Sequence, residues 1–409
     1  VRGLMMSTQT TRRKTAVEPQ QKRYYSYKTF KKLGVPAIVY STASKIAAKV
    51  VRVQTAEIVP STTSLNRNND GQTKEKVALV TGSNTGVGFE TAKKLAVNHG
   101  YEVIIASRSE DKGKAACDAI NDVIQKLPSP SAACTNGKAV FLQSVDLSNL
   151  DSVREFCQAV DKEYDIIDVL VNNAGKNSAG TSTQKLKNGE NLDDLFTTNF
   201  LGHFLLTNLL LQKCKRIVNL SSVMHHFPVY SRKDNISDID SVDFWRNYAV
   251  EPVDREVAER KPYAPSKLAA LLFSIELNRR YQESAGLRSI AVNPGSVNSD
   301  IWRNYPSVMK AIFTKIYLSS EQGSTTSVAA SVMHFDQDVV YLQPYWLPHS
   351  ARKHIQSSNT SPCPFPMFEM LGPYVGYRPT QPRLPVDGGL KAANSLFTVC
   401  EELTGCRYP

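Results

Sequence analysis

The sequence predicts an α/β fold built on a doubly wound parallel sheet with helices on both faces. Between residues 75 and 335, short apolar runs alternate with amphipathic stretches at helical spacing. Such alternation is typical of βαβ units, and their right-handed crossovers give a doubly wound sheet. No segment repeats at a period of roughly 20 to 50 residues, so a solenoid is not expected.

Each predicted strand is a short apolar run that ends at a polar or glycine-rich turn. In chain order the strands are Val77–Thr81, Tyr101–Ser107, Ala139–Val145, Ile166–Asn172, Arg216–Ser221 and Ser289–Asn293. The amphipathic stretches between and after them predict helices. These helices are Phe89–Asn98, Asp111–Leu127, Asp193–Lys213 and Gly389–Gly405. The segment Pro128–Lys138 is rich in Pro, Ser and Ala and is expected to be a loop.

Composition divides the chain into an N-terminal extension and one folded domain. Residues 1–60 contain twelve Lys or Arg and two acidic residues, so nearly all of the net charge of +11 lies there. The remainder is almost neutral, which argues against a nucleic-acid-binding body. Residues 61–75 are polar and lack periodicity, as a linker does. We therefore expect an extension over 1–74 and a single domain over 75–409.

The extension has the composition of an organellar transit peptide, since it is rich in Arg, Ser and Thr and poor in acids. The run Arg23-Tyr24-Tyr25-Ser26 resembles a mitochondrial processing site, which favours a mitochondrion over a plastid. The alternative is a flexible leader with no folded role. Lys45 and Lys49 would share one face of a helix, so peripheral contact with a membrane surface is a further expectation.

The seven cysteines are expected to be free thiols. Their number is odd, no Cys-x-x-Cys pair occurs and no secretory signal is visible, which is typical of a reducing compartment. No spacing of cysteines matches a structural zinc site, so no metal is predicted.

A second change in composition marks residues 343–385. This stretch holds nine prolines and six aromatic residues. It is too apolar for a disordered tail and too rich in proline for regular structure. We expect an ordered C-terminal insertion that serves as a lid or an interface.

A glycine-rich turn follows the first predicted strand and opens the first predicted helix, which is the context that a dinucleotide-binding motif requires. Gly82 permits a tight turn, Gly86 lets the backbone approach a pyrophosphate, and Gly88 allows close packing of helix on strand. The positive end of the helix dipole would face the phosphates. The residues of this turn predicted to bind the cofactor are Gly82, Ser83, Asn84, Thr85, Gly86, Val87 and Gly88.

The end of the second predicted strand favours NADP over NAD. An NAD site usually has an acidic residue there, which hydrogen-bonds the ribose 2′-hydroxyl. Here Ser107 and Arg108 occupy the position, and the first acid is Glu110. A guanidinium forms charge-assisted hydrogen bonds with a 2′-phosphate, so NADPH is the predicted cofactor.

Tyr263 and Lys267 are four positions apart, so on a helix they share one face. A carbonyl that accepts a hydride needs a proton donor beside it, and a free tyrosine titrates near ~10. A neighbouring cation would make Tyr263 an effective acid/base at neutral pH. Lys267 could supply that charge and also hold the nicotinamide ribose.

In their order along the chain, the glycine turn, Asn172-Asn173-Ala174-Gly175, Asn199, Ser222 and Tyr263-x-x-x-Lys267 resemble the short-chain dehydrogenase/reductase family. The resemblance implies a Rossmann-type fold and a catalytic tetrad of Asn199, Ser222, Tyr263 and Lys267. It implies that Ser222 hydrogen-bonds the substrate oxygen and that Asn199 anchors a water behind the lysine. Further residues that it implies at the cofactor are Asp146, Leu147, Asn173, Ala174, Gly175, Pro294, Gly295 and Ser299.

The long insertion between Ser222 and Tyr263 and the run 199–207 resemble the retinol dehydrogenase-like branch of this family, which also includes protochlorophyllide reductases. Aromatic residues of the insertion would either form the walls of an apolar pocket or pack within the loop. They are Phe244, Trp245 and Tyr248.

We therefore expect an NADP-dependent oxidoreductase that interconverts carbonyl and alcohol on a bulky apolar substrate, with Tyr263 as the acid/base. One alternative is reduction of a conjugated C=C bond, as in the protochlorophyllide reductase relatives. Another is a catalytically idle NADP-binding subunit of an organellar assembly, although this leaves the complete tetrad without a reason. A homo-oligomer is compatible with each of these functions.

Overall fold

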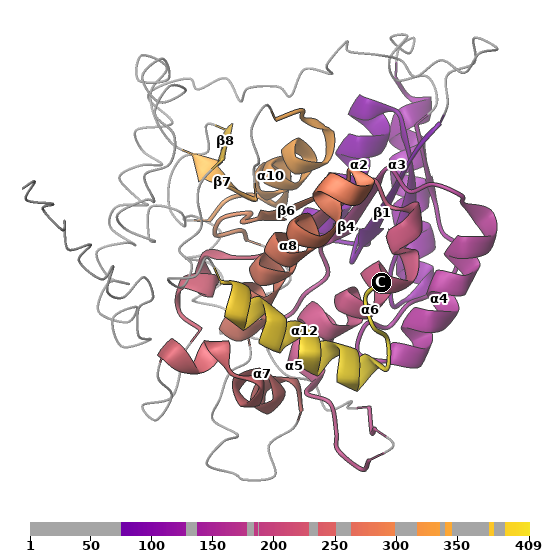
Figure 1. Cartoon of the computed structure of the whole chain (residues 1–409). Helices are drawn as coiled ribbons and strands as arrows, with labels where there is room; N and C mark the ends of the chain where they lie inside the picture. Colours follow the sequence, from indigo (N-terminus) through magenta and orange to yellow (C-terminus); the bar gives the residue numbers. More distant parts are fainter. Residues whose placement is uncertain are drawn as a thin grey trace, which may run out of the picture.

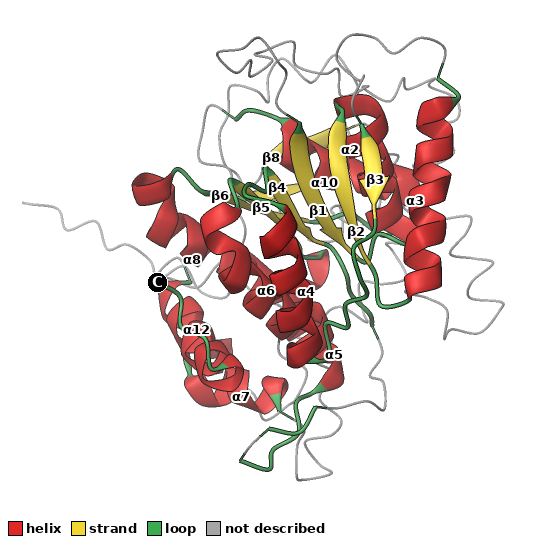
Figure 2. Ribbon diagram, turned by 90° about the vertical axis from the view of Figure 1, so that its right-hand side faces the viewer, coloured by secondary structure: helices red, strands yellow, loops and turns green. Residues whose placement is uncertain are grey.

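The computed structural model describes residues 75–127, 137–177, 184–186, 188–228, 236–250, 263–298, 317–335, 340–345, 376–379 and 389–409. Within this part of the chain, helices cover both faces of one eight-stranded sheet (Figures 1 and 2). The strand order is β3-β2-β1-β4-β5-β6-β7-β8, with β8 antiparallel to β7 and all other pairs parallel. The predicted doubly wound sheet is confirmed. The predicted extension over 1–74 lies outside the described residues.

The strands are short, and the central ones are buried on both faces. They are β1 (Lys76–Thr81), β2 (Tyr101–Ala106), β3 (Lys138–Val140), β4 (Val169–Asn172), β5 (Arg216–Leu220), β6 (Arg288–Val292), β7 (Tyr341–Tyr345) and β8 (Gly376–Pro379). Every residue of β2 and β4 is buried, and β1 exposes only Lys76. These strands therefore read as continuous apolar runs, as strands between two helical layers do.

The helical elements vary in type and length. The α-helices are α2 (Gly86–His99), α3 (Glu110–Gln125), α4 (Leu150–Glu163), α5 (Asp194–Phe196), α6 (Gly202–Leu210), α7 (Val242–Ala249), α8 (Tyr263–Ala285), α10 (Ser320–Val332) and α12 (Leu390–Thr404). A single turn of π-helix, η1 (Thr197–Leu201), joins α5 to α6 and is called the π-turn below. Three short 3-10 helices are η2 (Leu211–Lys213), η3 (Val223–His226) and η4 (Ile236–Asp240).

Two hydrophobic cores lie on opposite faces of the sheet. Leu79 of β1 packs in the core that contains α4, α6 and α8, whereas Ala78 and Val80 pack in the core that contains α2, α3 and α10. Successive side chains of a strand point to opposite faces, so β1 contributes to both cores. The carboxyl ends of the parallel strands then meet at one edge of the sheet.

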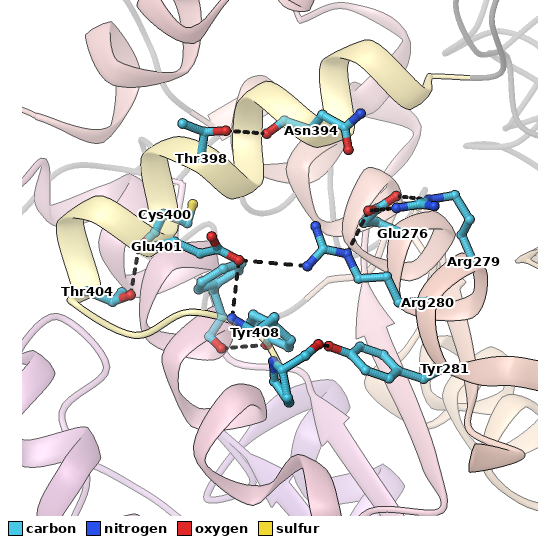
Figure 3. A network of polar contacts seen from close by, with 12 residues as sticks. Glu276, Arg279, Arg280, Tyr281, Asn394, Thr398, Cys400, Glu401, Thr404 and Tyr408 are labelled. Carbon is cyan, nitrogen blue, oxygen red and sulfur yellow. Dashed lines mark hydrogen bonds and ion pairs between the residues drawn. The ribbon is translucent and has the colours of Figure 1, made fainter. Parts of the chain in front are cut away.

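A further layer covers the outer side of α6 and α8. Helix α12 packs on α8 and α7 (Figure 1). Phe397 of α12 contacts Phe204 of α6 and Phe273 of α8, with ring centroids 5.2 and 5.7 Å apart. At the end of this layer Arg280 pairs with Glu401 (Figure 3). The segment predicted as a helix over Gly389–Gly405 thus returns to the core.

The aromatic residues of the insertion before Tyr263 lie in α7 and belong to the same core. Phe244, Trp245 and Tyr248 are 5%, 0% and 2% exposed. The indole Nε1 of Trp245 donates to Ile239 O at 2.9 Å. These side chains therefore contribute to the packing of the core.

Two expectations on the strands need correction. The predicted strand Ala139–Val145 forms regular structure only up to Val140, although Val145 N still donates to Ser107 O at 2.9 Å. The proline-rich stretch 343–385 was expected to exclude regular structure, yet its described parts form the end of β7 and all of β8. β6 pairs with β7 only at Tyr341 and Leu342. Leu342 O accepts from Asn293 N, which directly follows β6, and residues two apart in a strand face the same neighbour, so the nitrogen of Pro344 faces the side where pairing with β6 has ended and the missing N–H is tolerated.

Candidate active site

The glycine turn between β1 and α2 requires glycine at Gly82, Gly86 and Gly88. Gly82 and Gly86 have φ of 63° and 62°, in the left-handed region that favours glycine. A Cβ on Gly88 would lie 2.3 Å from Asn173 Nδ2 and 2.4 Å from Gly82 O. Ser83 Oγ donates to Val80 O at 2.7 Å and so ties the turn to β1.

The N-terminus of α2 is suited to an anion. Its N-cap residue Thr85 makes no capping hydrogen bond with its side chain, and no acidic residue lies in the first turn. The N–H groups of a first helical turn have no intrahelical acceptor and carry the positive end of the dipole. A backbone held this tightly, with these N–H groups beside it, fits the pyrophosphate of a dinucleotide.

The loop after β4 lies against this turn. Asn173 Nδ2 donates to Thr81 O at 2.7 Å, and Thr81 Oγ1 accepts from the backbone N–H groups of Asn173 and Ala174 at 2.9 and 3.0 Å. A Cβ on Gly82 would lie 2.9 Å from Ala174 Cα. The glycine turn and the Asn173–Gly175 loop therefore form one packed unit.

The end of β2 presents a guanidinium. Ser107 is buried and donates from Oγ to Ser109 O at 3.1 Å, whereas Arg108 is exposed. Glu110, the first acid after the strand, pairs with Lys114 one helical turn along α3 at 2.6 Å. The nearest downstream carboxylate is thus held by a lysine of its own helix.

Asp146 and Leu147 follow β3 at the same edge of the sheet. Asp146 Oδ1 accepts from Ser148 N and Ser148 Oγ at 2.9 and 2.7 Å, which holds the carboxylate in place. Leu147 is 5% exposed. Its carbonyl oxygen lies 2.3 Å from the position of a Cβ on Gly202, so α6 begins directly against this loop.

The turn after β6 completes this edge. Gly295 has φ of 82° and donates from its backbone N to Asn293 Oδ1 at 3.0 Å. Pro294 precedes it in the same turn. Val297, two residues on, packs with Val87 of the glycine turn. The predicted residue Ser299 lies outside the described residues.

Tyr263 and Lys267 lie at the start of α8, one turn apart on the same face, as predicted. Lys267 Nζ is 5.7 Å from the centroid of the Tyr263 ring and donates to Leu220 O at 2.9 Å. Lys267 is 5% exposed, and this burial lowers the pKa of its ammonium to about 8. A buried ammonium beside a phenol stabilises the phenolate, so the phenol gives up its proton more readily, as an acid/base tyrosine must.

Asn199 lies in the π-turn and converges with Lys267. Its Nδ2 donates to Lys176 O at 2.9 Å, and its Oδ1 accepts from Lys176 N at 2.8 Å. A Cβ on Gly175 would lie 3.4 Å from both Asn199 Oδ1 and Lys267 Nζ. The π-turn is a departure from the predicted helix Asp193–Lys213, which is helical throughout but changes type here. π-Turns are frequent at functional sites.

The two adjacent serines after β5 have different surroundings. Ser221 is 2% exposed and donates from Oγ to Lys267 O at 2.8 Å, so its hydroxyl is engaged with the backbone of α8. Ser222 is half-buried, and its Oγ accepts from Met224 N at 3.3 Å. Ser222 is therefore the more accessible of the two hydroxyl groups.

Sequence reasoning missed three side chains at this edge of the sheet. His203 Nε2 lies 2.8 Å from Thr81 Oγ1, and Lys176 forms an ion pair with Asp194 next to the π-turn. Two signals were present in the sequence, since Lys176 directly follows Gly175 and His203 follows Asn199 by one helical turn.

The described segments contain neither a cluster of metal ligands nor a helix that could span a membrane. No three His, Cys, Asp or Glu side chains there gather as metal ligands do. None of the helices in these segments combines the length and the apolar character that a membrane span needs.

Comparisons with known proteins identify the relatives of this chain. Residues 76–233 match the short chain dehydrogenase family. Retinol dehydrogenase 11 of Mus musculus is 34% identical over 261 residues, which cover 62% of this chain and 72% of that protein. Polyprenol dehydrogenase of Homo sapiens is 31% identical over 272 residues, which cover 63% of this chain and 73% of that protein.

A solved structure supports the fold. An uncharacterised protein of Mycobacterium paratuberculosis superposes with a TM-score of 0.51 at 27% identity, over 82% of this chain and 95% of that one. Sequence and structure therefore agree with the resemblance drawn from the motifs. The chain belongs to the short-chain dehydrogenase family, in its retinol dehydrogenase-like branch, and is an oxidoreductase with a nicotinamide cofactor.

Proposed function

We propose that this oxidoreductase uses NADP to interconvert a carbonyl and an alcohol on a bulky apolar substrate, with Tyr263 as the acid/base. The observation that carries the proposal is the meeting of three groups at one point. The buried Lys267 ammonium lies beside the Tyr263 ring, and both Lys267 Nζ and Asn199 Oδ1 lie next to Gly175. A solvated surface helix gives no reason for this convergence.

Bound nicotinamide would supply or accept the hydride at the substrate carbon. In the direction of reduction, Tyr263 donates its hydroxyl proton to the carbonyl oxygen, and Ser222 holds that oxygen by a hydrogen bond. Lys267 stabilises the phenolate that Tyr263 leaves behind. Asn199 anchors a water behind Lys267, which returns the proton to Tyr263. Oxidation of the alcohol runs through the same groups in reverse.

The preference for NADP rests on the end of β2. Arg108 is exposed there, and Glu110 is engaged with Lys114 at 2.6 Å. A 2′-phosphate would gain charge-assisted hydrogen bonds from the guanidinium and meet no free carboxylate at this position. A cofactor without that phosphate would gain much less.

The proposed substrate class rests on the names of two relatives. Retinol and polyprenol, on which they act by name, are both large apolar alcohols. We extend this class, a large apolar alcohol and its carbonyl counterpart, to the present protein. Reduction of a conjugated C=C bond is the competing outcome of the test below.

The test is a substrate screen with matched tyrosine variants. Purified protein is incubated with NADPH and, in turn, long-chain aldehydes, apolar ketones and enones, and the products are identified by mass spectrometry. Alcohol products that disappear in Tyr263→Phe but persist in Tyr281→Phe, a change near the other end of the same helix, support the proposal. Saturated carbonyl products point to C=C reduction. Turnover that survives in Tyr263→Phe contradicts the proton-transfer role.

We further propose that residues 1–74 target the protein to an organelle, with a mitochondrion favoured, and contact its membrane surface. The support is the basic, acid-poor composition of this segment. A fluorescent fusion with the full chain should colocalise with a mitochondrial marker, and a fusion that starts at Glu75 should not. Retention of the same location by the shorter fusion contradicts the proposal.

A further inference from the structure

One hydroxyl group joins three segments of the active site. Thr81 Oγ1, at the end of β1, accepts from the backbone N–H groups of Asn173 and Ala174. The same oxygen lies 2.8 Å from His203 Nε2 in α6. The other ring nitrogen, His203 Nδ1, lies 3.2 Å from the backbone oxygen of Asn199. The chain Asn173–Thr81–His203–Asn199 therefore connects the cofactor loop to the π-turn.

The direction of each hydrogen bond follows from the number of protons and lone pairs. A hydroxyl oxygen has two lone pairs and one proton. Both lone pairs of Thr81 Oγ1 are taken by the N–H groups of Asn173 and Ala174, so this oxygen cannot also accept from His203. Its single proton has two acceptors within reach, Val171 O at 3.4 Å and His203 Nε2 at 2.8 Å, and the shorter contact favours donation to His203. The backbone oxygen of Asn199 can only accept, so His203 Nδ1 must donate. Both requirements select the neutral imidazole with its proton on Nδ1.

The surroundings keep this imidazole neutral. His203 is 3% exposed and lies between β1 and the π-turn. Burial, assisted by the charge of Lys267, lowers the pKa of His203 to about 3. The ring is therefore uncharged over the physiological pH range, so Nδ1 remains the donor and Nε2 the acceptor.

We propose that His203 is a positioning residue that sets the place of Asn199 relative to the Asn173–Gly175 loop. This inference rests on the proposed role of Asn199 in proton return. The imidazole bonds to Thr81 through its acceptor nitrogen and to Asn199 O through its donor nitrogen. A shift of the Asn173–Gly175 loop, which is bonded to Thr81, would therefore also shift the backbone of the π-turn. Such precision matters, because a misplacement of about 1 Å at a catalytic group costs roughly 100-fold in rate.

Two substitutions separate the two ends of this link. In His203→Asn the amide replaces Nδ1, which keeps a donor for Asn199 O and loses the bond to Thr81. In His203→Gln the amide replaces Nε2, which keeps an acceptor for the Thr81 hydroxyl and loses the bond to Asn199 O. We expect His203→Asn to raise KM for NADPH with little change in kcat. We expect His203→Gln to lower kcat roughly 10- to 100-fold with little change in KM for NADPH.

Tyr408→Phe is the matched control. Tyr408 OH donates to Phe204 O at 2.8 Å, so this variant also removes a hydrogen bond to the backbone of α6, one residue from His203. Its kcat should equal that of the unmodified protein. Equal losses of kcat in Tyr408→Phe and His203→Gln, or identical kinetic changes in the two His203 variants, overturn the proposal.

A measurement on the unmodified protein does not depend on how the variants fold. Heteronuclear NMR of the histidine-labelled full chain, with His203→Gln used for assignment, reports which ring nitrogen carries the proton. A proton on Nδ1 near neutral pH supports the proposal, and a proton on Nε2 or a charged ring overturns it. If Asn199→Ala keeps full turnover, the proposed function of Asn199 fails. If Asn199→Ala loses turnover while His203→Gln does not, the positioning role alone fails.

Discussion

Ser221 donates a hydrogen bond from Oγ to the backbone oxygen of Lys267 at 2.8 Å, which ties the end of β5 to the first turn of α8. The neighbouring Ser222 is half-buried and has no such tie to α8 among the described hydrogen bonds. The two adjacent hydroxyl groups are therefore expected to do different work, one in stability and one in turnover.

Single alanine variants should separate these roles. Ser221→Ala should lower the free energy of unfolding by about 1 kcal/mol, the net value of one hydrogen bond, and keep most of the turnover. Ser222→Ala should lower kcat roughly 100-fold, as removal of a hydrogen-bond donor to a developing oxyanion does, with little change in stability. Urea unfolding and steady-state kinetics of both variants measure this contrast. The opposite pattern would move the substrate contact to Ser221.

The buried ammonium of Lys267 makes stability depend on pH. Its pKa falls from 10.5 in the unfolded chain to about 8 in the fold because burial disfavours the charge. Between these two values the unfolded lysine holds a proton that the folded one has released, so the free energy of unfolding rises with pH over this window. Below pH 8 the buried charge costs about 3 kcal/mol.

Lys267→Met removes that cost. The cofactor-free variant should resist urea better than the unmodified protein near neutral pH, and its advantage should shrink as pH rises from about 8 toward 10.5. Urea unfolding of both proteins across this range gives the measurement. An advantage that stays constant with pH would show that Lys267 does not titrate in this window.

Arg108 offers a direct test of cofactor choice. Arg108→Ala should weaken NADPH binding by about 1.5–3 kcal/mol, the scale of a hydrogen bond to a charged group, and leave NADH binding nearly unchanged. Lys112→Ala is the control, because it removes a positive charge from an exposed position of the adjacent helix. Calorimetric titration with both cofactors distinguishes the cases. Equal affinity of the unmodified protein for NADPH and NADH would contradict the proposed preference.

Much of the fold was predictable because its signals are local. The alternation of apolar runs and helices identified the strands from β1 to β6, and the glycine turn marked the junction of β1 and α2. The placement of Tyr263 and Lys267 on one helical face needed only their spacing. These patterns act within a few residues of the chain, where periodicity and turn chemistry carry the information.

Other features depend on partners far away in the sequence. The spacing of apolar residues around Asn199 indicates a helix but does not distinguish a turn of α-helix from a turn of π-helix. His203 lies opposite Thr81, which is 122 residues away, and no local pattern reports this contact. The choice between Ser221 and Ser222 likewise depends on where the backbone of Lys267 lies. Pro344 is accommodated in β7 by the way this strand pairs with β6 and β8. The local propensity of proline alone indicates that no strand forms there.

The outer layer formed by α12 is expected to stabilise the helix that carries Tyr263 and Lys267. Phe397 is 1% exposed and contacts Phe204, Phe273 and Tyr408. The guanidinium of Arg280, from the far end of α8, lies 4.4 Å from the centroid of its ring. Phe397→Ala should lower the free energy of unfolding by about 3–5 kcal/mol, because it leaves a cavity and removes these contacts.

Leu390→Ala provides the comparison on the same helix, since Leu390 is 40% exposed and its truncation should change stability by no more than about 0.5 kcal/mol. Urea unfolding monitored by circular dichroism measures both variants. If α12 supports α8, Phe397→Ala should also weaken NADPH binding through the loosened first turn of α8, at temperatures where the variant is still folded. Both expected effects act through the contact of Phe397 with Phe273 of α8. A large loss of stability with unchanged cofactor affinity would therefore show that α12 stabilises the domain without holding the active-site helix.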